Sequence, residues 1–489
     1  MGGRGNPRKR SAVLAATGSG GLVALSALTA AAAFATDDAA LIMGGTGTPI
    51  PPESYIQAVN ELYLHCDPPA CALQGVDTPE GLYPIVGGPK ELTLNQSVAQ
   101  GVAILDNAIQ EQLAAGNDVT VFGYSQSAVI ATEEMENIAN GIAGIDPSPE
   151  QLHFVMIGDP NNPNGGLLER LDLPPNSDPT VASLGITFNG ATPVDDYPTA
   201  IYTGEYDGFA DFPRYPIDVL ADLNALLGIL FVHTEYPDLT AAQLSSAVEV
   251  PTSAGYDGAT TYWMIPTEYL PLLDPLRAIP VSGPILADLL QPDVEVLVNL
   301  GYGDPAYGWV NDNANVPTPA GLFPSLADLE KVPGLLVAGT EEGIQDAISD
   351  IEHPAQLFSL ASNPVLRLLE ESYVAAVTFK DIAISPGSDT PLGIVDALSG
   401  AASSLYGTLL PTADIINALL TTVPAEDLTI FAYELSQGNV LDAIGMPVAV
   451  NAALLPLGGL FDIIAVGEGV FTAGLDLASP FIEIPGLIP

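Results

Sequence analysis

Apolar runs that alternate with helical patterns dominate the N-terminal half of the chain. Between the runs, Ser54–Leu64, Thr93–Leu113 and the segment from Ser125 to about Ile142 have the spacing of apolar residues that is typical of helices. Strands that alternate with helices predict an α/β fold with a mostly parallel sheet covered on both faces. The four runs with the length and composition of buried strands are Ala39–Met43, Val119–Phe122, His153–Ile157 and Ala200–Thr203.

The ends of these predicted strands carry small and polar residues. Gly44–Gly47, Ser125, Asp159 and Asp207 each follow one strand. Ligands of parallel sheets bind beyond the carboxyl ends of the strands. We therefore expect these positions to face one crevice and to contain the functional site.

The pattern changes at about Pro317, where the chain becomes rich in Ala, Leu, Gly and Pro with scattered acidic residues. The apolar stretch Val448–Val466 contains Asp462, which favours a buried or surface-associated helical region over a membrane span. We see no catalytic constellation there, and we divide the chain into residues 1–36, an α/β domain at 37–316 and a mainly helical region at 317–489. Short helical patterns in this last region occur at Ser325–Lys331, Gly343–Ile351 and Val440–Ile444.

Composition limits the possible partners. The 489 residues include 59 acidic but only 11 Lys and Arg residues, for a net charge of −48. Such a surface repels nucleic acid and anionic lipid headgroups, so we predict no nucleic-acid partner. With 48% hydrophobic residues, the chain is too apolar to be disordered.

The N-terminus predicts export. Basic residues between Arg4 and Arg10 precede the uncharged apolar segment Ser11–Phe34, and Ala33-Phe34-Ala35 fits a small-x-small cleavage site. The apolar segment is also long enough to remain in the bilayer as an anchor. In both cases, the rest of the chain leaves the cytoplasm for the cell envelope or beyond.

The two cysteines, Cys66 and Cys71, lie close together in a Pro-containing segment. In an exported protein, we expect them to form a local disulfide. The segment offers too few soft ligands for zinc, and we predict neither a metal nor a cofactor.

The segment Gly123-Tyr124-Ser125-Gln126-Ser127 lies between a predicted strand and a predicted helix. This is the context of a nucleophile elbow, in which a serine at a sharp turn is flanked by small residues. Ser127 occupies a position where glycine is commoner. The alternative is an ordinary turn serine between a core strand and a core helix.

A nucleophilic serine needs a histidine as base, and the chain has only four. His65 precedes the elbow, His153 opens a strand at the end opposite the crevice, and His353 lies in the C-terminal region. Both His233, which follows the fourth strand, and His353 leave room for the order Ser, Asp, His of α/β-hydrolases, and His233 is nearer to the core fold. The alternative for His233 is a helix-end histidine bonded to the backbone.

The acid of such a triad should follow a strand between Ser125 and His233. Asp207 fits this best, but Asp211 lies only four residues further on, and spacing does not separate the two. Asp159 has the surroundings of a turn that shapes the rim of the crevice. Asp195 and Asp196 are weaker candidates, which we expect to be solvated.

The negative oxygen of a tetrahedral intermediate needs N–H or O–H donors in fixed positions. The backbone N–H of Gln126 follows the nucleophile at the positive end of a helix. The glycines around Thr46 allow its N–H or hydroxyl to approach as the second donor. The alternative for this loop is an ordinary glycine-rich turn.

Several separated motifs resemble the mycobacterial PE-PPE C-terminal domain, over roughly residues 38–310. That family is similar to cutinases, so the resemblance implies a serine α/β-hydrolase fold with esterase, lipase or acyltransferase activity on acyl esters of the envelope. At the matching positions, it implies Ser125 as nucleophile, Asp207 as acid and His233 as base. The motifs are Gly44–Gly47, Thr78–Pro84, Ser97–Gly101, Gly123–Ala128, Gly158–Gly166, Tyr206–Pro213 and Leu300–Asp304.

The chain differs from many of these relatives because a signal or anchor stands where they have PE or PPE helical modules. It is therefore similar to stand-alone members, some of which act in assembling acylated trehalose glycolipids. We expect a lipid or acyl-ester substrate, with water or a sugar hydroxyl as acceptor of the acyl group. Tyr262–Ile265 and Leu270–Leu273 either line an acyl groove or pack in the core. A non-catalytic envelope protein on a hydrolase scaffold is the rival hypothesis.

Overall fold

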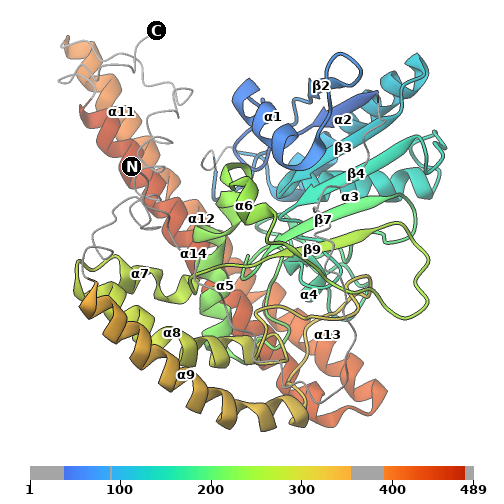
Figure 1. Cartoon of the computed structure of the whole chain (residues 1–489). Helices are drawn as coiled ribbons and strands as arrows, with labels where there is room; N and C mark the ends of the chain where they lie inside the picture. Colours follow the sequence, from blue (N-terminus) through green and yellow to red (C-terminus); the bar gives the residue numbers. More distant parts are fainter. Residues whose placement is uncertain (1–37, 87, 89–90, 354–389, 479–489) are drawn as a thin grey trace, which may run out of the picture.

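A seven-stranded sheet forms the centre of the computed structural model, which describes residues 38–86, 88, 91–353 and 390–478 (Figure 1). The predicted signal or anchor, residues 1–36, lies outside the described residues. The strands are parallel apart from the last, β8, which is antiparallel to its neighbour β9. In spatial order they are β2 (Ala72–Gly75), β1 (Ala39–Ile42), β3 (Val119–Tyr124), β4 (Leu152–Ile157), β7 (Thr199–Gly204), β9 (Thr261–Ile265) and β8 (Val248–Glu249).

Side chains alternate between two cores, as the two-residue period of a strand requires. On one face of the sheet, β-strand residues pack against α2 (Leu94–Ala115), α3 (Gln126–Ala139) and α5 (Val219–Phe231). On the other face, they pack against α1 (Glu53–Val59) and the π-helix Asn60–Leu64 that continues it. This arrangement confirms the predicted α/β-hydrolase type of fold.

Helix α2, which the sequence predicted at Thr93–Leu113, begins and ends at residues that cap it. Thr93 caps α2 by accepting a hydrogen bond from the N–H of Gln96, whose side chain accepts one from the N–H of Thr93 in return. Gly116 ends α2 in the left-handed conformation at φ 88°. The shorter elements are α4 (Leu167–Arg170), α6 (Ala241–Leu244), α7 (Asp274–Arg277), the 3₁₀ helices His233–Asp238 and Pro271–Leu273, and the small antiparallel pair β5 (Thr180–Val181) and β6 (Ile186–Thr187).

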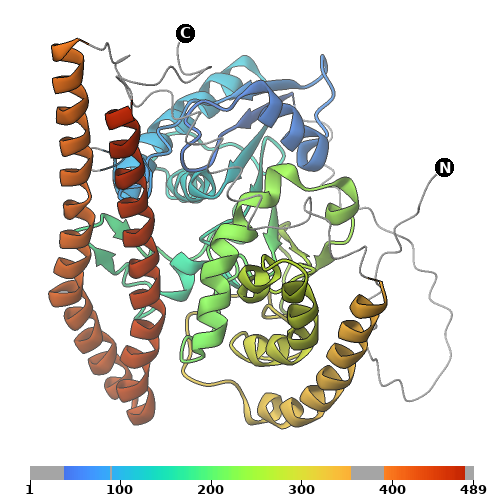
Figure 2. The same cartoon turned by 90° about the vertical axis from the view of Figure 1, so that its left-hand side faces the viewer.

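Long helices follow the sheet. Helix α8 (Ser282–Leu300) packs against α9 (Leu326–Glu352). We call the sheet and the helices that pack on its two faces the hydrolase-type domain. Helix α14 (Val440–Ala478) runs along the helices that precede it and contacts α5 of this domain (Figure 2). Those preceding helices are α11 (Pro391–Gly407), α12 (Leu409–Leu420) and α13 (Thr422–Gln437).

The predicted short helices at Ser325–Lys331, Gly343–Ile351 and Val440–Ile444 were wrong in extent, because they are pieces of the 27-residue α9 and the 39-residue α14. Glycine and proline within these helices interrupt the local pattern, and Pro333 and Pro456 are examples. Packing against neighbouring helices outweighs this weak local preference.

Three described segments are long and apolar enough to cross a membrane by length and composition. They are Val219–Asp238, Pro391–Gln437 and Val440–Ala478. The first forms part of the packed core around α5.

Cys66 and Cys71 are joined by a disulfide, with their Cα atoms 5.4 Å apart. The bond closes the short loop between the π-helix and β2. It lies on the sheet face opposite α2 and α3, where Cys71 is buried among the residues that pack around α1.

Candidate active site

Ser125 stands at the turn between β3 and α3, where the sequence predicts the elbow. Its backbone has φ 56° and ψ −116°, a region that residues with a side chain rarely adopt. The N–H of Ser125 donates to the carbonyl of Ile157 at 3.1 Å, and its own carbonyl accepts from Ala128 at 3.0 Å. These bonds hold the strained turn between two parallel strands and the first turn of the helix.

The flanking residues explain why the turn needs small side chains. A Cβ atom on Gly123 would lie only 2.7 Å from the carbonyl oxygen of Ser127 and 2.8 Å from Cα of Ala128. Ser127, at the position where glycine is commoner, is fully buried. Its hydroxyl accepts from the N–H of Tyr124 at 2.8 Å and donates to the carbonyl of the same residue at 3.1 Å. The extra hydroxyl therefore satisfies backbone groups at the end of β3.

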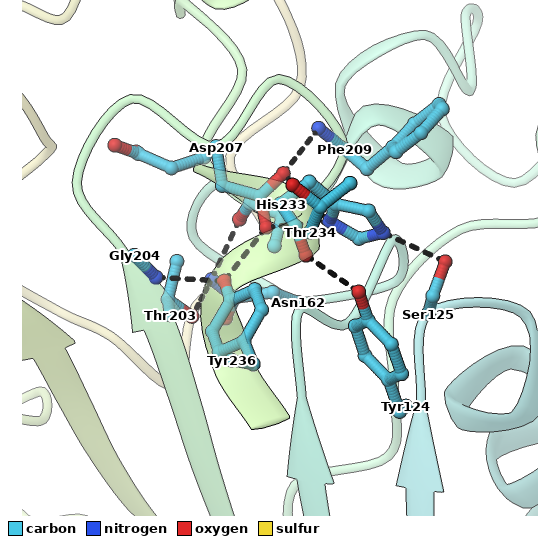
Figure 3. A network of polar contacts seen from close by, with 12 residues as sticks. Tyr124, Ser125, Asn162, Thr203, Gly204, Asp207, Phe209, His233, Thr234 and Tyr236 are labelled. Carbon is cyan, nitrogen blue, oxygen red and sulfur yellow. Dashed lines mark hydrogen bonds and ion pairs between the residues drawn. The ribbon is translucent and has the colours of Figure 1, made fainter. Parts of the chain in front are cut away.

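Ser125, His233 and Asp207 form one connected chain of hydrogen bonds (Figure 3). Nε2 of His233 lies 2.7 Å from Oγ of Ser125, and Nδ1 lies 2.8 and 2.9 Å from the two carboxylate oxygens of Asp207. Ser125 and His233 are 8% and 6% exposed, and Asp207 is fully buried. The structure thus brings together the three residues that the sequence singled out.

Asp207 is held by two further donors. The hydroxyl of Tyr236 donates to one carboxylate oxygen at 2.6 Å, and the N–H of Phe209 donates to the other at 2.9 Å. The Tyr236 oxygen in turn accepts from the N–H of Gly204 at 2.7 Å. Burial, followed by the neighbouring Asp207, raises the pKa of Tyr236 well above its ordinary value, so the hydroxyl keeps its proton and donates. Sequence reasoning missed Tyr236, which lies three residues after the histidine in the 3₁₀ helix.

The imidazole of His233 is also fixed by its surroundings. The hydroxyl of Tyr124 donates to the backbone carbonyl of His233 at 2.7 Å, and the ring of Phe209 stands edge-on to the imidazole at 4.8 Å. Gly158 has φ +55°, and a Cβ atom there would lie 3.0 Å from Cε1 of His233. Only glycine therefore leaves room for the imidazole at the end of β4.

The other acidic candidates serve different contacts. Asp211 is fully buried and accepts from the N–H of Tyr206 at 3.0 Å, with no bond to the histidine among the described residues. Burial raises the pKa of Asp211 well above its ordinary value. Asp159 accepts from the N–H of Asn161 at 2.9 Å and from the hydroxyl of Thr192 at 2.7 Å. Of the rivals that spacing left open, Asp207 is the one that contacts His233.

Thr46 and Gln126 meet beside the serine. The side-chain amide of Gln126 donates to Oγ1 of Thr46 at 3.1 Å and to the carbonyl of Gly81 at 3.0 Å, and its oxygen accepts from Ser97 at 2.5 Å. Because the Thr46 oxygen acts as an acceptor here, its proton can point away, toward the cavity that it lines together with Ser125. The backbone N–H of Gln126 lies in the first turn of α3, where amides lack partners within the helix.

A cavity of about 330 Å³ opens above these residues, within the range of small-molecule sites. Apart from a small polar group at one end, its walls are apolar, and they come from the hydrolase-type domain and from α12, α13 and α14. Tyr262 and Met264 instead pack in the core beneath the sheet, and Leu270 and Leu273 pack in a separate cluster. The polar group consists of Thr46, Tyr124, Ser125, Gln126, His233 and Thr234.

In the part of the chain that the structure describes, no group of three or more His, Cys, Asp or Glu side chains is placed to hold a metal ion.

The parallel sheet, the elbow serine and the Ser–His–Asp contacts are the arrangement of the serine α/β-hydrolases. Residues 69–303 match the family model described as the PE-PPE domain. The chain belongs to the PE-PPE domain family, as its motifs predicted.

Relatives from Mycobacterium tuberculosis extend this result. The chain is 42% identical to the uncharacterized PPE family protein PPE28, over 95% of this chain and 70% of that protein. It is 45% identical to the esterase PE16, over 73% of this chain and 64% of PE16. It is 30% identical to the diacyltrehalose acyltransferase Chp2, over 53% of this chain and 70% of Chp2. The match to PPE28 extends well into the helical C-terminal region, and relatives named for ester hydrolysis and for acyl transfer support an ester-acting family.

Proposed function

We propose that the protein is an exported serine hydrolase that cleaves or transfers acyl groups of lipid esters. The observation that carries this proposal is the position of His233, whose two ring nitrogens bridge Ser125 at 2.7 Å and Asp207 at 2.8 Å. An activated serine that lines an apolar cavity suits an ester with a hydrocarbon acyl chain.

The chemistry follows from the geometry. Ser125 Oγ attacks the ester carbonyl while Nε2 of His233 takes its proton, and Asp207 stabilises the imidazolium that forms. The N–H of Gln126 and the hydroxyl of Thr46 donate to the negative oxygen of the tetrahedral intermediate. His233 then protonates the leaving alcohol, and the acyl group remains bonded to Ser125.

A second nucleophile completes the cycle. Water releases a fatty acid, whereas a sugar hydroxyl takes the acyl group and forms a new ester. Transfer is favoured where water is excluded, and the walls beyond the catalytic end of the cavity are apolar. Similarity to Chp2 supports transfer, and similarity to PE16 supports hydrolysis.

The test measures hydrolysis of p-nitrophenyl esters and labelling by a fluorophosphonate probe. Ser125→Ala should lower kcat by about 10⁴-fold or more and abolish labelling, because nucleophile and base act as a unit. Ser246→Ala is the control, since Ser246 is exposed on the surface beyond α6. A folded wild-type protein that neither hydrolyses esters nor labels would refute the proposal and favour a non-catalytic scaffold.

Acyl transfer has its own test. Turnover is measured with a long-chain p-nitrophenyl ester in the presence of trehalose, and the acylated sugar is detected by mass spectrometry. An acylated sugar that depends on Ser125 would support transfer. Fatty acid as the sole product would restrict the proposal to hydrolysis.

A further inference from the structure

The wall of the cavity across from the catalytic residues is made by α12, α13 and α14, the last helices that the structure describes. Ser125 and its partners occupy the end of the cavity formed by the hydrolase-type domain, with Val129 of α3 and Ile229 of α5 beside them. The opposite side consists of apolar side chains from α12, α13 and α14. No polar residue of these three helices lines the cavity.

One face of α14 supplies most of this wall. Leu454, Leu457, Gly458, Phe461 and Ile464 line the cavity, and their spacing of three and four residues puts them on one side of the helix. Leu457 and Phe461 are 6% and 5% exposed, so this side is packed against the rest of the molecule. The same helix contacts α5, whose end leads directly into His233.

Helix α12 supplies the facing part and is bound to the hydrolase-type domain by polar contacts. Ile415 and Leu419 line the cavity one turn apart. Between the helices and the domain, the hydroxyl of Tyr83 donates to the carboxylate of Asp414 at 2.6 Å, and the hydroxyl of Ser183 donates to the carbonyl of Asp414 at 2.8 Å. These bonds hold α12 in a fixed position over the cavity.

We infer that α12 to α14 form the acyl-chain half of the site and that Gly458 determines which acyl lengths fit. This inference rests on the proposed function. A hydrocarbon chain that leaves water for this cavity gains roughly fourfold in binding for each buried methylene. The polar end holds the ester, and the apolar end takes the acyl chain and limits its length.

A larger side chain at Gly458 should shorten the longest acyl chain that the cavity accepts. A Cβ atom there would lie 3.7 Å from Cγ2 of Ile415, an ordinary contact, so the backbone accepts a side chain. A leucine would then occupy space between α14 and α12. Gly459, the next residue, is exposed, and a Cβ atom there meets nothing within 4 Å.

The first experiment compares Gly458→Leu with Gly459→Leu, which adds the same side chain to the same helix. The readout is the ratio of kcat/KM for p-nitrophenyl laurate to that for p-nitrophenyl butyrate. Gly458→Leu should lower this ratio at least tenfold, and Gly459→Leu should leave it at the wild-type value. Equal ratios in folded wild-type and Gly458→Leu protein would overturn the inference.

A second pair on the facing helix guards against a folding defect in the first. Ile415→Trp fills the same cavity from α12, whereas Ile416→Trp adds the same ring to a residue that is 50% exposed and outside the lining. We expect the laurate-to-butyrate ratio to fall in Ile415→Trp alone. An unchanged laurate-to-butyrate ratio in folded Ile415→Trp protein would contradict the inference that the acyl chain lies in this part of the cavity.

A binding measurement separates this inference from the proposed function. In a Ser125→Ala background, a dansylated fatty acid should bind at least tenfold more weakly when Gly458→Leu is added. If esters are hydrolysed but neither Gly458→Leu nor Ile415→Trp changes the laurate-to-butyrate ratio, this inference fails while the proposed enzymatic function is supported. If no ester is hydrolysed but Gly458→Leu weakens binding of the fatty acid, the inference of an acyl-chain site is supported and the proposed enzymatic function fails.

Discussion

The hydrolase-type domain and the helices between Pro391 and Ala478 contribute to one cavity but are built in opposite ways. In the domain, the central strands β1 and β7 are buried along their whole length, and each triad residue is held by named hydrogen bonds. In the helices, large apolar side chains such as Leu420 and Ile463 are 74% and 71% exposed. The helices contain no Lys or Arg, so apolar packing and a few hydrogen bonds hold them in place.

The difference between the two regions shows that the catalytic groups must be positioned more accurately than the apolar wall that contacts the acyl chain. Proton transfer requires atoms within hydrogen-bond distance, and a small displacement of a catalytic group is costly. An acyl chain requires only an apolar wall at van der Waals distance, and many side chains provide it. We therefore expect substitutions in the domain to change rates strongly and substitutions in the helices to change chain-length preference.

The largest effect that sharpens this comparison is expected at the acid. Asp207→Asn should lower kcat for p-nitrophenyl butyrate by about 10³- to 10⁴-fold, because the amide no longer stabilises the protonated imidazole or its tautomer. Steady-state kinetics checks this, with circular dichroism to confirm the fold. Asp211→Asn is the matched control, and a larger loss of kcat in that variant would reassign the acid.

A smaller effect is expected at the second oxyanion donor. Thr46→Val should lower kcat by about 10²- to 10³-fold with little change in KM, because the donor acts in the transition state. Thr46→Ser keeps the hydroxyl and should recover most of the rate. Equal rates for the valine and serine variants would show that the hydroxyl takes no part.

The smallest effect concerns the bond between the two regions. Tyr83→Phe removes the hydroxyl that donates to Asp414 at 2.6 Å and should destabilise the docking of α12 by about 1 kcal/mol. We expect a two- to fivefold drop in the laurate-to-butyrate ratio while kcat for butyrate stays near wild type. A drop in both substrates alike would mean that Tyr83 supports the catalytic end of the site instead.

Much of the domain could be predicted from sequence because its signals are local. A β-branched run ending in Gly-x-Ser is a pattern of adjacent residues, and the run and its turn lie where the pattern indicates. With four histidines in the chain, chain order reduced the candidates for the base to His233 and His353, and His233 was preferred because it is nearer to the core fold. Asp207 and Asp211 remained open because both occupy one loop, and spacing does not specify which carboxylate turns toward His233.

Other features depend on contacts between distant segments. Tyr236 reaches Asp207 across 29 positions of sequence, and Gly158 leaves room for an imidazole that lies on another element. The wall from α14 has no motif, only an apolar composition that fits core, surface or membrane equally. Its role becomes visible only when the fold brings Leu457 and Phe461 to the cavity that Ser125 lines.

The position of α14 after the catalytic residues in the sequence has a further consequence for folding. Ser125, Asp207 and His233 all precede α12 to α14 in the sequence, so a chain in which the sheet folds before these helices dock leaves the apolar side of the cavity uncovered. Exposed apolar surface of this kind promotes aggregation of folding intermediates. We therefore expect a chain that ends before α12 to aggregate more readily than the full chain, because α12 to α14 cover this surface.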